Sequence, residues 1–81
     1  MTLKDTVNEM CSSDYKERFK AEYHQLEIRY NGLQQMLKKW DGGLLDFEPT
    51  CPRHIYKKQI VAMESYLTIL EERAKMEGVI L

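Results

Sequence analysis

The stretch that decides the fold is ERFKAEYHQLEIRYNGLQQMLKKW, residues Glu17 to Trp40. Its large apolar side chains recur at alternating steps of four and three residues, which places them along one side of an α-helix. No proline interrupts the stretch. A helix with a single apolar stripe must bury that stripe against a partner. The stripe consists of Phe19, Tyr23, Leu26, Tyr30, Leu33, Leu37 and Trp40.

A second segment, nearer the C-terminus, supplies this partner. Its apolar residues repeat with the same alternation of four and three steps. They are Tyr56, Ile60, Met63, Leu67, Leu70 and Ala74. Two such stripes joined by a short link predict that the segments pack against each other as an antiparallel helical hairpin. We therefore expect an all-α fold.

Turn-forming residues divide the chain into segments. A polar break at residues 12–14 separates a short N-terminal helix from the long one, and Gly42 and Gly78 end the two long helices. We expect a single domain over residues 1–81. Within it we expect a docking helix in 1–13, helices over 14–41 and 52–77, a link over 42–51 and an apolar tail over 78–81.

The link and the tail contain large apolar side chains, although connections between helices are usually polar. These are Leu44, Leu45 and Phe47 in the link and Val79, Ile80 and Leu81 in the tail. Exposed apolar groups favour association. We therefore expect the link to fold back over the end of the hairpin and the tail to pack into a neighbouring groove.

The composition indicates self-association and excludes some partners. A two-helix unit in a chain of 81 residues buries little surface, so we expect it to gain stability by forming a homo-oligomer. Apolar residues outside the main stripe of the first long helix, namely Ala21, Ile28 and Met36, suggest contact with another subunit or with the N-terminal helix. The net charge of −1 provides no general attraction to DNA, RNA or an anionic membrane. No apolar run is long enough to span a bilayer or to form a secretion signal, so we expect a cytoplasmic protein.

The sequence contains little that supports catalysis or metal binding. Cys11 and Cys51 are too few for a disulfide framework, and the two histidines are far apart. A zinc site is therefore not expected. The chain also lacks a glycine-rich phosphate loop and a nucleophile elbow. We expect a protein that is not an enzyme and has no cofactor.

Antiparallel packing places two polar groups of residues at opposite ends of the hairpin. The group at the linked end contains Lys38, Lys39, Arg53, His54, Lys57 and Lys58. It is either an anion site beside a helix N-terminus or a solvated charged tip. The group at the open end contains Arg18, Glu22 and Arg73 near Tyr15 and Tyr23, with Arg29 and Tyr66 further in. Arginine and aromatic side chains together are typical of phosphate and base recognition. The alternative is an Arg18–Glu22 ion pair beside a tyrosine-rich core.

Part of the chain resembles a group of small phage proteins. The segment YKERFKAE, residues 15–22, is followed by the leucines of the stripe and then by a spaced set of residues in the second helix, Gln59, Met63, Tyr66, Leu70 and Arg73. This pattern is similar to phage helical-hairpin proteins related to the anti-CBASS and anti-Thoeris sponges. The link segment LDFEPTCP, residues 45–52, is similar to small phage open reading frames.

The resemblance implies a function. Sponges of this kind assemble, often as hexamers, and bind immune second messengers of the host in pockets between subunits without hydrolysing them. The implied ligands are cyclic di- or trinucleotides or cyclic ADP-ribose-type signals, and the implied location is the host cytoplasm. The motif-matched positions are Arg18, Gln59, Tyr66 and Arg73. Together with two neighbours, the expected ligand-binding residues are Tyr15, Arg18, Arg29, Gln59, Tyr66 and Arg73. The alternative function is that of a helical, oligomeric protein-interaction or adaptor module of a phage.

Overall fold

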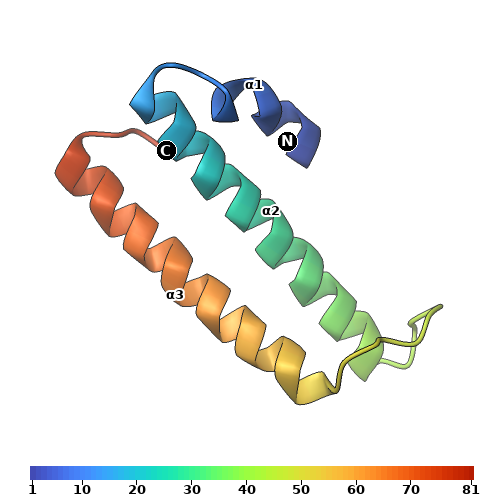
Figure 1. Cartoon of the computed structure of the whole chain (residues 1–81). Helices are drawn as coiled ribbons and strands as arrows, with labels where there is room; N and C mark the ends of the chain where they lie inside the picture. Colours follow the sequence, from blue (N-terminus) through green and yellow to red (C-terminus); the bar gives the residue numbers. More distant parts are fainter.

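The computed structural model describes all residues from 1 to 81 and contains helices and no strands (Figure 1). A 3-10 turn, η1 (Leu3–Thr6), leads into the short helix α1 (Val7–Met10). Two long helices follow, α2 (Tyr15–Asp41) and α3 (Arg53–Glu77). The predicted all-α class is confirmed.

The two long helices lie side by side and run in opposite directions (Figure 1). Tyr15 at the start of α2 hydrogen-bonds Glu77 at the end of α3, while Asp41 at the end of α2 pairs with Arg53 at the start of α3. We call the first of these ends the open end and the second the linked end. The molecule is elongated, with extents of 43 × 24 × 17 Å. Neither long helix has the apolar length required to cross a membrane.

The apolar stripes that the sequence indicates face each other across this contact. Every member of both stripes is buried or half-buried. The core is concentrated toward the open end, where Phe19, Leu70, Ala74 and Val79 form one cluster, and the side chain of Leu70 is fully buried. Burial of these side chains is the main stabilising contribution, at roughly 1.5–3 kcal/mol for each large aliphatic or aromatic group.

Gly78 ends α3 and directs the chain back toward the core. Its φ of +70° lies in the left-handed region, and the N–H of Val79 donates to the carbonyl of Ala74 at 2.8 Å. This C-cap turns Val79 into the cluster, where it is 7% exposed. Ile80, in contrast, is 84% exposed. The expected packing of the tail is therefore seen for Val79 and not for Ile80, whereas Leu81 is 42% exposed and lines a hollow with Val79 and Tyr23.

The N-terminal turn packs on α2 through a satisfied polar contact. Thr6 is fully buried; its hydroxyl donates to the carbonyl of Leu3 at 2.7 Å and accepts from Nε2 of Gln25 at 2.9 Å. A buried hydroxyl with both partners avoids the desolvation penalty of an unpaired one. Ala21, on α2, is also fully buried. Both η1 and α1 contact α2.

The expectation that the link folds back over the end of the hairpin is wrong for two of its three large apolar side chains. The third, Leu45, is half-buried. The link extends away from the two helices (Figure 1), and Leu44 and Phe47 are 75% and 54% exposed. The cause lies in the helix end, where the N–H of Leu44 donates to the carbonyl of Lys39 and Gly43 has a φ of +70°. This turn caps α2 and sends the chain outward.

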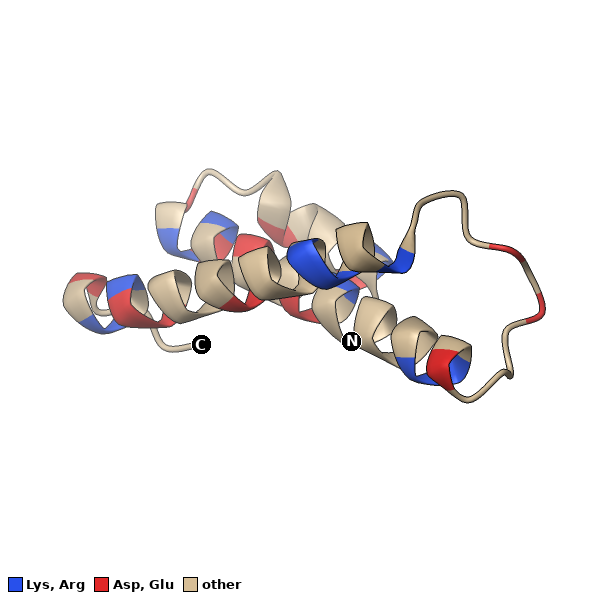
Figure 2. Ribbon diagram, turned by 90° about the horizontal axis from the view of Figure 1, so that it is seen from below, with Lys and Arg blue, Asp and Glu red and all other residues tan.

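The far end of the link also differs in detail from the sequence prediction. Pro52 has an extended ψ of 151° and is the N-cap of α3, so the helix begins at Arg53 instead of at the proline. The link carries acidic side chains and no basic ones, whereas both long helices carry charges of both signs (Figure 2).

Leu70→Ala should lower the free energy of unfolding by about 2–5 kcal/mol, because it opens a cavity in a fully buried site. Val61→Ala on the same helix, at a position that is 56% exposed, should change it by less than about 0.5 kcal/mol. Urea denaturation followed by circular dichroism measures both. Equal losses for the two variants would contradict the assignment of Leu70 to the core.

Candidate functional site

A hollow at the open end collects three of the six residues that the sequence predicts for ligand binding. It has a volume of about 330 Å³ and receives side chains from α1, α2 and α3. Its lining residues are Met10, Tyr15, Arg18, Phe19, Glu22 and Arg73. We call it the open-end hollow. Its mixture of guanidinium, carboxylate and aromatic groups can contact both a charged and a planar part of a ligand.

One corner of the hollow is a hydrogen-bonded group of three side chains. The Tyr15 hydroxyl donates to Oε1 of Glu77 at 2.6 Å, and Nε of Arg73 donates to Oε2 of the same carboxylate at 2.9 Å. Nη2 of Arg73 also donates to the Tyr15 oxygen at 2.9 Å. The guanidinium lies over the ring of Phe19, 5.0 Å from its centroid. Tyr15 and Arg73 therefore converge on one carboxylate from two different helices.

These contacts shift the ionisation of the exposed groups that make them. The hydrogen bond to Glu77 raises the pKa of Tyr15. The Tyr15 hydroxyl, followed by the Arg73 guanidinium, lowers the pKa of Glu77. The hydrogen bond to Glu77 raises the pKa of Arg73. At neutral pH the corner thus holds a carboxylate, a guanidinium and a neutral phenol.

Arg18 does not form the ion pair with Glu22 that the sequence offered as an alternative. Its Nη1 donates to the backbone carbonyl of Ser12 at 2.7 Å, and Glu22 instead accepts a hydrogen bond from the hydroxyl of Tyr66. No carboxylate lies within ion-pair distance of Arg18. Its positive charge is therefore available to a ligand in the hollow.

Arg29 and Gln59 lie outside the hollow. Both are exposed, and neither makes a side-chain hydrogen bond. The contacting pairs Tyr15–Arg73 and Glu22–Tyr66 are related by seven-residue steps along both helices. The same step leads to Arg29 and Gln59, about 10 Å further along the same side of the molecule. We call this side the polar flank. It consists of Tyr15, Arg18, Glu22, Arg29, Gln59, Tyr66 and Arg73.

The expected site residues did not include Phe19, Glu22 or Glu77, although all three contribute to this end of the molecule. The spacing of Arg73 and Glu77, four positions apart on one helix, is the signal that could have identified the carboxylate. No sequence rule indicates that Tyr15, 62 positions away, hydrogen-bonds the same group.

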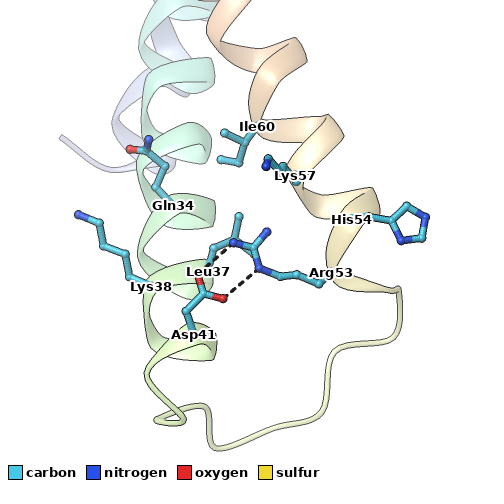
Figure 3. A pocket seen from close by; sticks show the side chains of 8 residues that line it. All are labelled: Gln34, Leu37, Lys38, Asp41, Arg53, His54, Lys57 and Ile60. Atoms are coloured by element: carbon cyan, nitrogen blue, oxygen red, sulfur yellow. Dashed lines mark hydrogen bonds and ion pairs between the residues drawn. The ribbon is translucent and has the colours of Figure 1, made fainter.

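A larger groove of about 750 Å³ lies at the linked end (Figure 3). Its lining includes the apolar side chains of Leu37 and Ile60. Arg53 donates to both oxygens of Asp41, at 3.2 and 3.1 Å, which lowers the pKa of that carboxyl. Figure 3 shows the side chains of Lys38 and His54 pointing away from the space between the helices. The remaining lining residues are Gln34 and Lys57.

The cations of the linked-end groove are thus largely unavailable to a ligand inside it. The charge of Arg53 is balanced by Asp41, and Lys38 and His54 point outward. Lys57 is the exception, because it forms no ion pair. This arrangement favours the interpretation of the linked end as a solvated charged tip.

The acidic, histidine and cysteine side chains do not form a metal-binding cluster. At no point do three or more His, Cys, Asp or Glu side chains converge as metal ligands would. Cys11 and Cys51 are both free and exposed. His24 faces Glu9 with 3.9 Å between Nδ1 and Oε2, which is beyond hydrogen-bond distance.

Glu77→Gln should lower the pKa of Tyr15 toward its ordinary value, because the acceptor that favours the neutral phenol loses its charge. With Glu77 present, the Tyr15–Glu77 contact stabilises the fold at pH values below the ordinary tyrosine pKa. This stabilisation is lost as the pH rises through the raised pKa of Tyr15. Carbon NMR of ring-labelled tyrosine follows the titration of each residue. Tyr30, which hydrogen-bonds Gln34, is the internal control. An unchanged Tyr15 titration in the variant would contradict the contact.

Comparisons with known proteins give one match. Neither the curated proteins nor the solved structures include a chain that matches this one. The family model described as Sequestin matches residues 13–76, from the turn before α2 into the last turn of α3. The match contains both long helices nearly in full and every residue of the polar flank, and it agrees with the resemblance to sponge-type phage proteins. On this match, which extends over well more than half of its length, the chain belongs to the Sequestin family.

Proposed function

We propose that this protein is a phage-encoded, non-enzymatic sponge that binds and sequesters cyclic nucleotide second messengers of host immunity. The proposed ligands are cyclic di- or trinucleotides or cyclic ADP-ribose-type signals, and their removal would inhibit anti-phage defence. Membership of the Sequestin family supports sequestration as the activity. The observation that carries the choice of ligand is the corner in which Tyr15 and Arg73 donate to one carboxylate.

The contacts of the Glu77 carboxylate indicate that this corner could bind a phosphate group. Its two oxygens accept hydrogen bonds from a guanidinium and a phenol, in a geometry that would serve two oxygens of a phosphate equally well. A phosphate entering the hollow would compete with Glu77 for Arg73. Arg18, which has no carboxylate partner, would supply the second charge that a nucleotide with more than one phosphate requires.

Aromatic side chains beside these cations would contact the bases. Tyr15 and Tyr66 are 48% and 42% exposed, so their rings are accessible for stacking. Stacking of a base on an aromatic side chain contributes about 1–3 kcal/mol and depends little on base identity. Arg29 and Gln59, further along the polar flank, would extend the contact to a larger cyclic ligand.

One subunit leaves this surface open on one side. Ligand sites usually bury most of the ligand, and the hollow of about 330 Å³ is at the small end of the usual range. We propose that a homo-oligomer, as large as a hexamer in related sponges, encloses the ligand between subunits. The proposed ligands are host signals, so the protein would act in the host cytoplasm.

Arg18→Ala and Arg73→Ala should each weaken binding of a cyclic dinucleotide or cyclic ADP-ribose-type ligand by about ten- to a hundredfold, because each removes a charge-assisted hydrogen bond. Lys57→Ala, in the linked-end groove, should have little effect. Isothermal titration calorimetry against a panel of these ligands measures the change. Equal affinities for all variants, or a loss specific to Lys57→Ala, would refute the assignment of the site.

Glu77→Gln should strengthen binding several-fold, because Arg73 is then no longer neutralised by an internal carboxylate.

The ligand recovered after heat denaturation of the complex should be chemically unchanged by mass spectrometry. Recovery of a cleaved nucleotide would identify an enzyme instead of a sponge.

The second candidate function is that of an oligomeric adaptor that binds another protein. The observation that favours it is the projecting link, in which Leu44 and Phe47 are exposed. Exposed apolar patches can mark sites of protein–protein interaction. An adaptor would show no thermal shift with any cyclic nucleotide, and Phe47→Ser would abolish its activity against host defence. A sponge would show the shift and retain it in this variant.

A further inference from the structure

A second apolar stripe runs along α3, outside its contact with α2. It repeats every seven residues, and its members, Ile55, Ala62, Ile69 and Met76, are all exposed. The three large side chains among them are 42%, 52% and 85% exposed. Between them lie Gln59, Tyr66 and Arg73, so the steps alternate four and three along the whole helix. We call these seven positions the outer seam.

The spacing of the outer seam is that of a coiled-coil contact. Side chains at alternating steps of four and three form a narrow stripe that packs against a similar stripe on another helix. From Ile55 to Met76 the seam is on the order of 30 Å long at 1.5 Å per residue. The core stripe of α3, which contacts α2, lies about a quarter turn around the helix. The outer seam therefore needs a helix that this chain does not supply.

We infer that this helix is α3 of a second copy of the chain, which packs antiparallel about a twofold axis close to Ser65 and Tyr66. In this arrangement the numbers of residues at the same level add to about 131. Ala62 then lies opposite Ile69 of the second copy, so a small side chain faces a large one. Interdigitation of small and large groups is the packing that helix contacts require. Each Tyr66 lies near its own counterpart.

Charge selects the antiparallel direction. The first turns of α3 carry Arg53, Lys57 and Lys58, and the first acidic residue of the helix, Glu64, lies close to its middle. Lys58 and Glu72 both border the outer seam, both are exposed, and neither forms an ion pair within the chain. Antiparallel packing places Lys58 level with Glu72 of the second copy, and the symmetry creates the pair twice. Parallel packing would place each lysine opposite a lysine.

The second copy also completes the ligand site, and this part of the inference rests on the proposed function. Tyr66 and Arg73 belong both to the outer seam and to the polar flank, where they contact Glu22 and Tyr15 of α2. A helix seated on the seam would stand beside these side chains as the missing wall of the open-end hollow. Two equivalent sites would result, one on each side of the twofold axis.

The first test compares two glutamate variants at similarly exposed aliphatic positions of α3. Ile69, changed in Ile69→Glu, lies in the outer seam. Val61, changed in Val61→Glu, lies outside the seam and is 56% exposed in the wild type. Ile69→Glu should raise the dissociation constant of the dimer by roughly a hundredfold, and Val61→Glu should leave it unchanged. Analytical ultracentrifugation measures mass, and circular dichroism confirms that both variants are folded. A wild-type protein that remains a 9.6 kDa monomer at millimolar concentration would overturn the inference, as would an unchanged mass of Ile69→Glu.

Charge reversal tests the partners across the interface. Lys58→Glu and Glu72→Lys should each weaken the dimer by about tenfold, because each turns two attractive pairs into two repulsive ones. The double variant should return to wild-type affinity. Failure of the double variant to recover would exclude the proposed pairing.

Cysteine cross-linking tests the direction of the helices, in a background with Cys11→Ser and Cys51→Ser. Ser65→Cys, close to the twofold axis, should form a disulfide between copies on mild oxidation. Met76→Cys, at the end of the seam, should not. The opposite result, or cross-linking at both positions, would overturn the antiparallel arrangement. A dimer that passes these tests without binding any cyclic nucleotide would refute the proposed function and leave the interface established.

Discussion

The mutual burial of two apolar stripes is the constraint on which the rest of this structure depends. Neither long helix can leave its apolar stripe exposed to water. Because each stripe is only one side chain wide, the two helices can bury both stripes in only one rotational setting. The fully buried Leu70 and the nearby Phe19 fix that setting at the open end. Once it is fixed, every other position on the two helices has a defined neighbour. The polar flank is a consequence of the core, because Tyr15 meets Arg73 only in this register.

Much of the fold could be predicted from the sequence because its signals are local. The alternation of four and three steps requires no knowledge of distant residues, and all members of both stripes are at least half-buried. Gly78 ends α3 where expected, because a glycine accepts the left-handed conformation at low cost. The prediction for the link was wrong at Leu44 and Phe47 for the opposite reason. Whether Leu44 and Phe47 pack on the helices depends on the direction of the chain after the turn that ends α2. The apolar character of the two residues does not determine that direction.

Three of the six expected site residues share one hollow, but the contacts that they make could not be predicted from the sequence. Tyr15, Arg18 and Arg73 line one hollow, as the register of the stripes implies. Their partners depend on competition between nearby groups. Glu22 could accept a hydrogen bond from Arg18 on its own helix, yet it accepts one from Tyr66 of α3, which leaves Arg18 to the carbonyl of Ser12. Spacing along one helix cannot rank such alternatives, because the deciding groups come from another part of the chain.

The turn at Gly78 connects a solvent-exposed position to the interior of the protein. The backbone there is left-handed, a conformation that costs most other residues about 1–2 kcal/mol. A residue that did not adopt the left-handed conformation would also move Val79 out of the cluster and leave a void beside Phe19 and Leu70. In a deep mutational scan, Gly78 would therefore show the intolerance of an interior residue although solvent surrounds it. Evolutionary pressure at this position would act on the backbone angle, with no contribution from any side-chain contact.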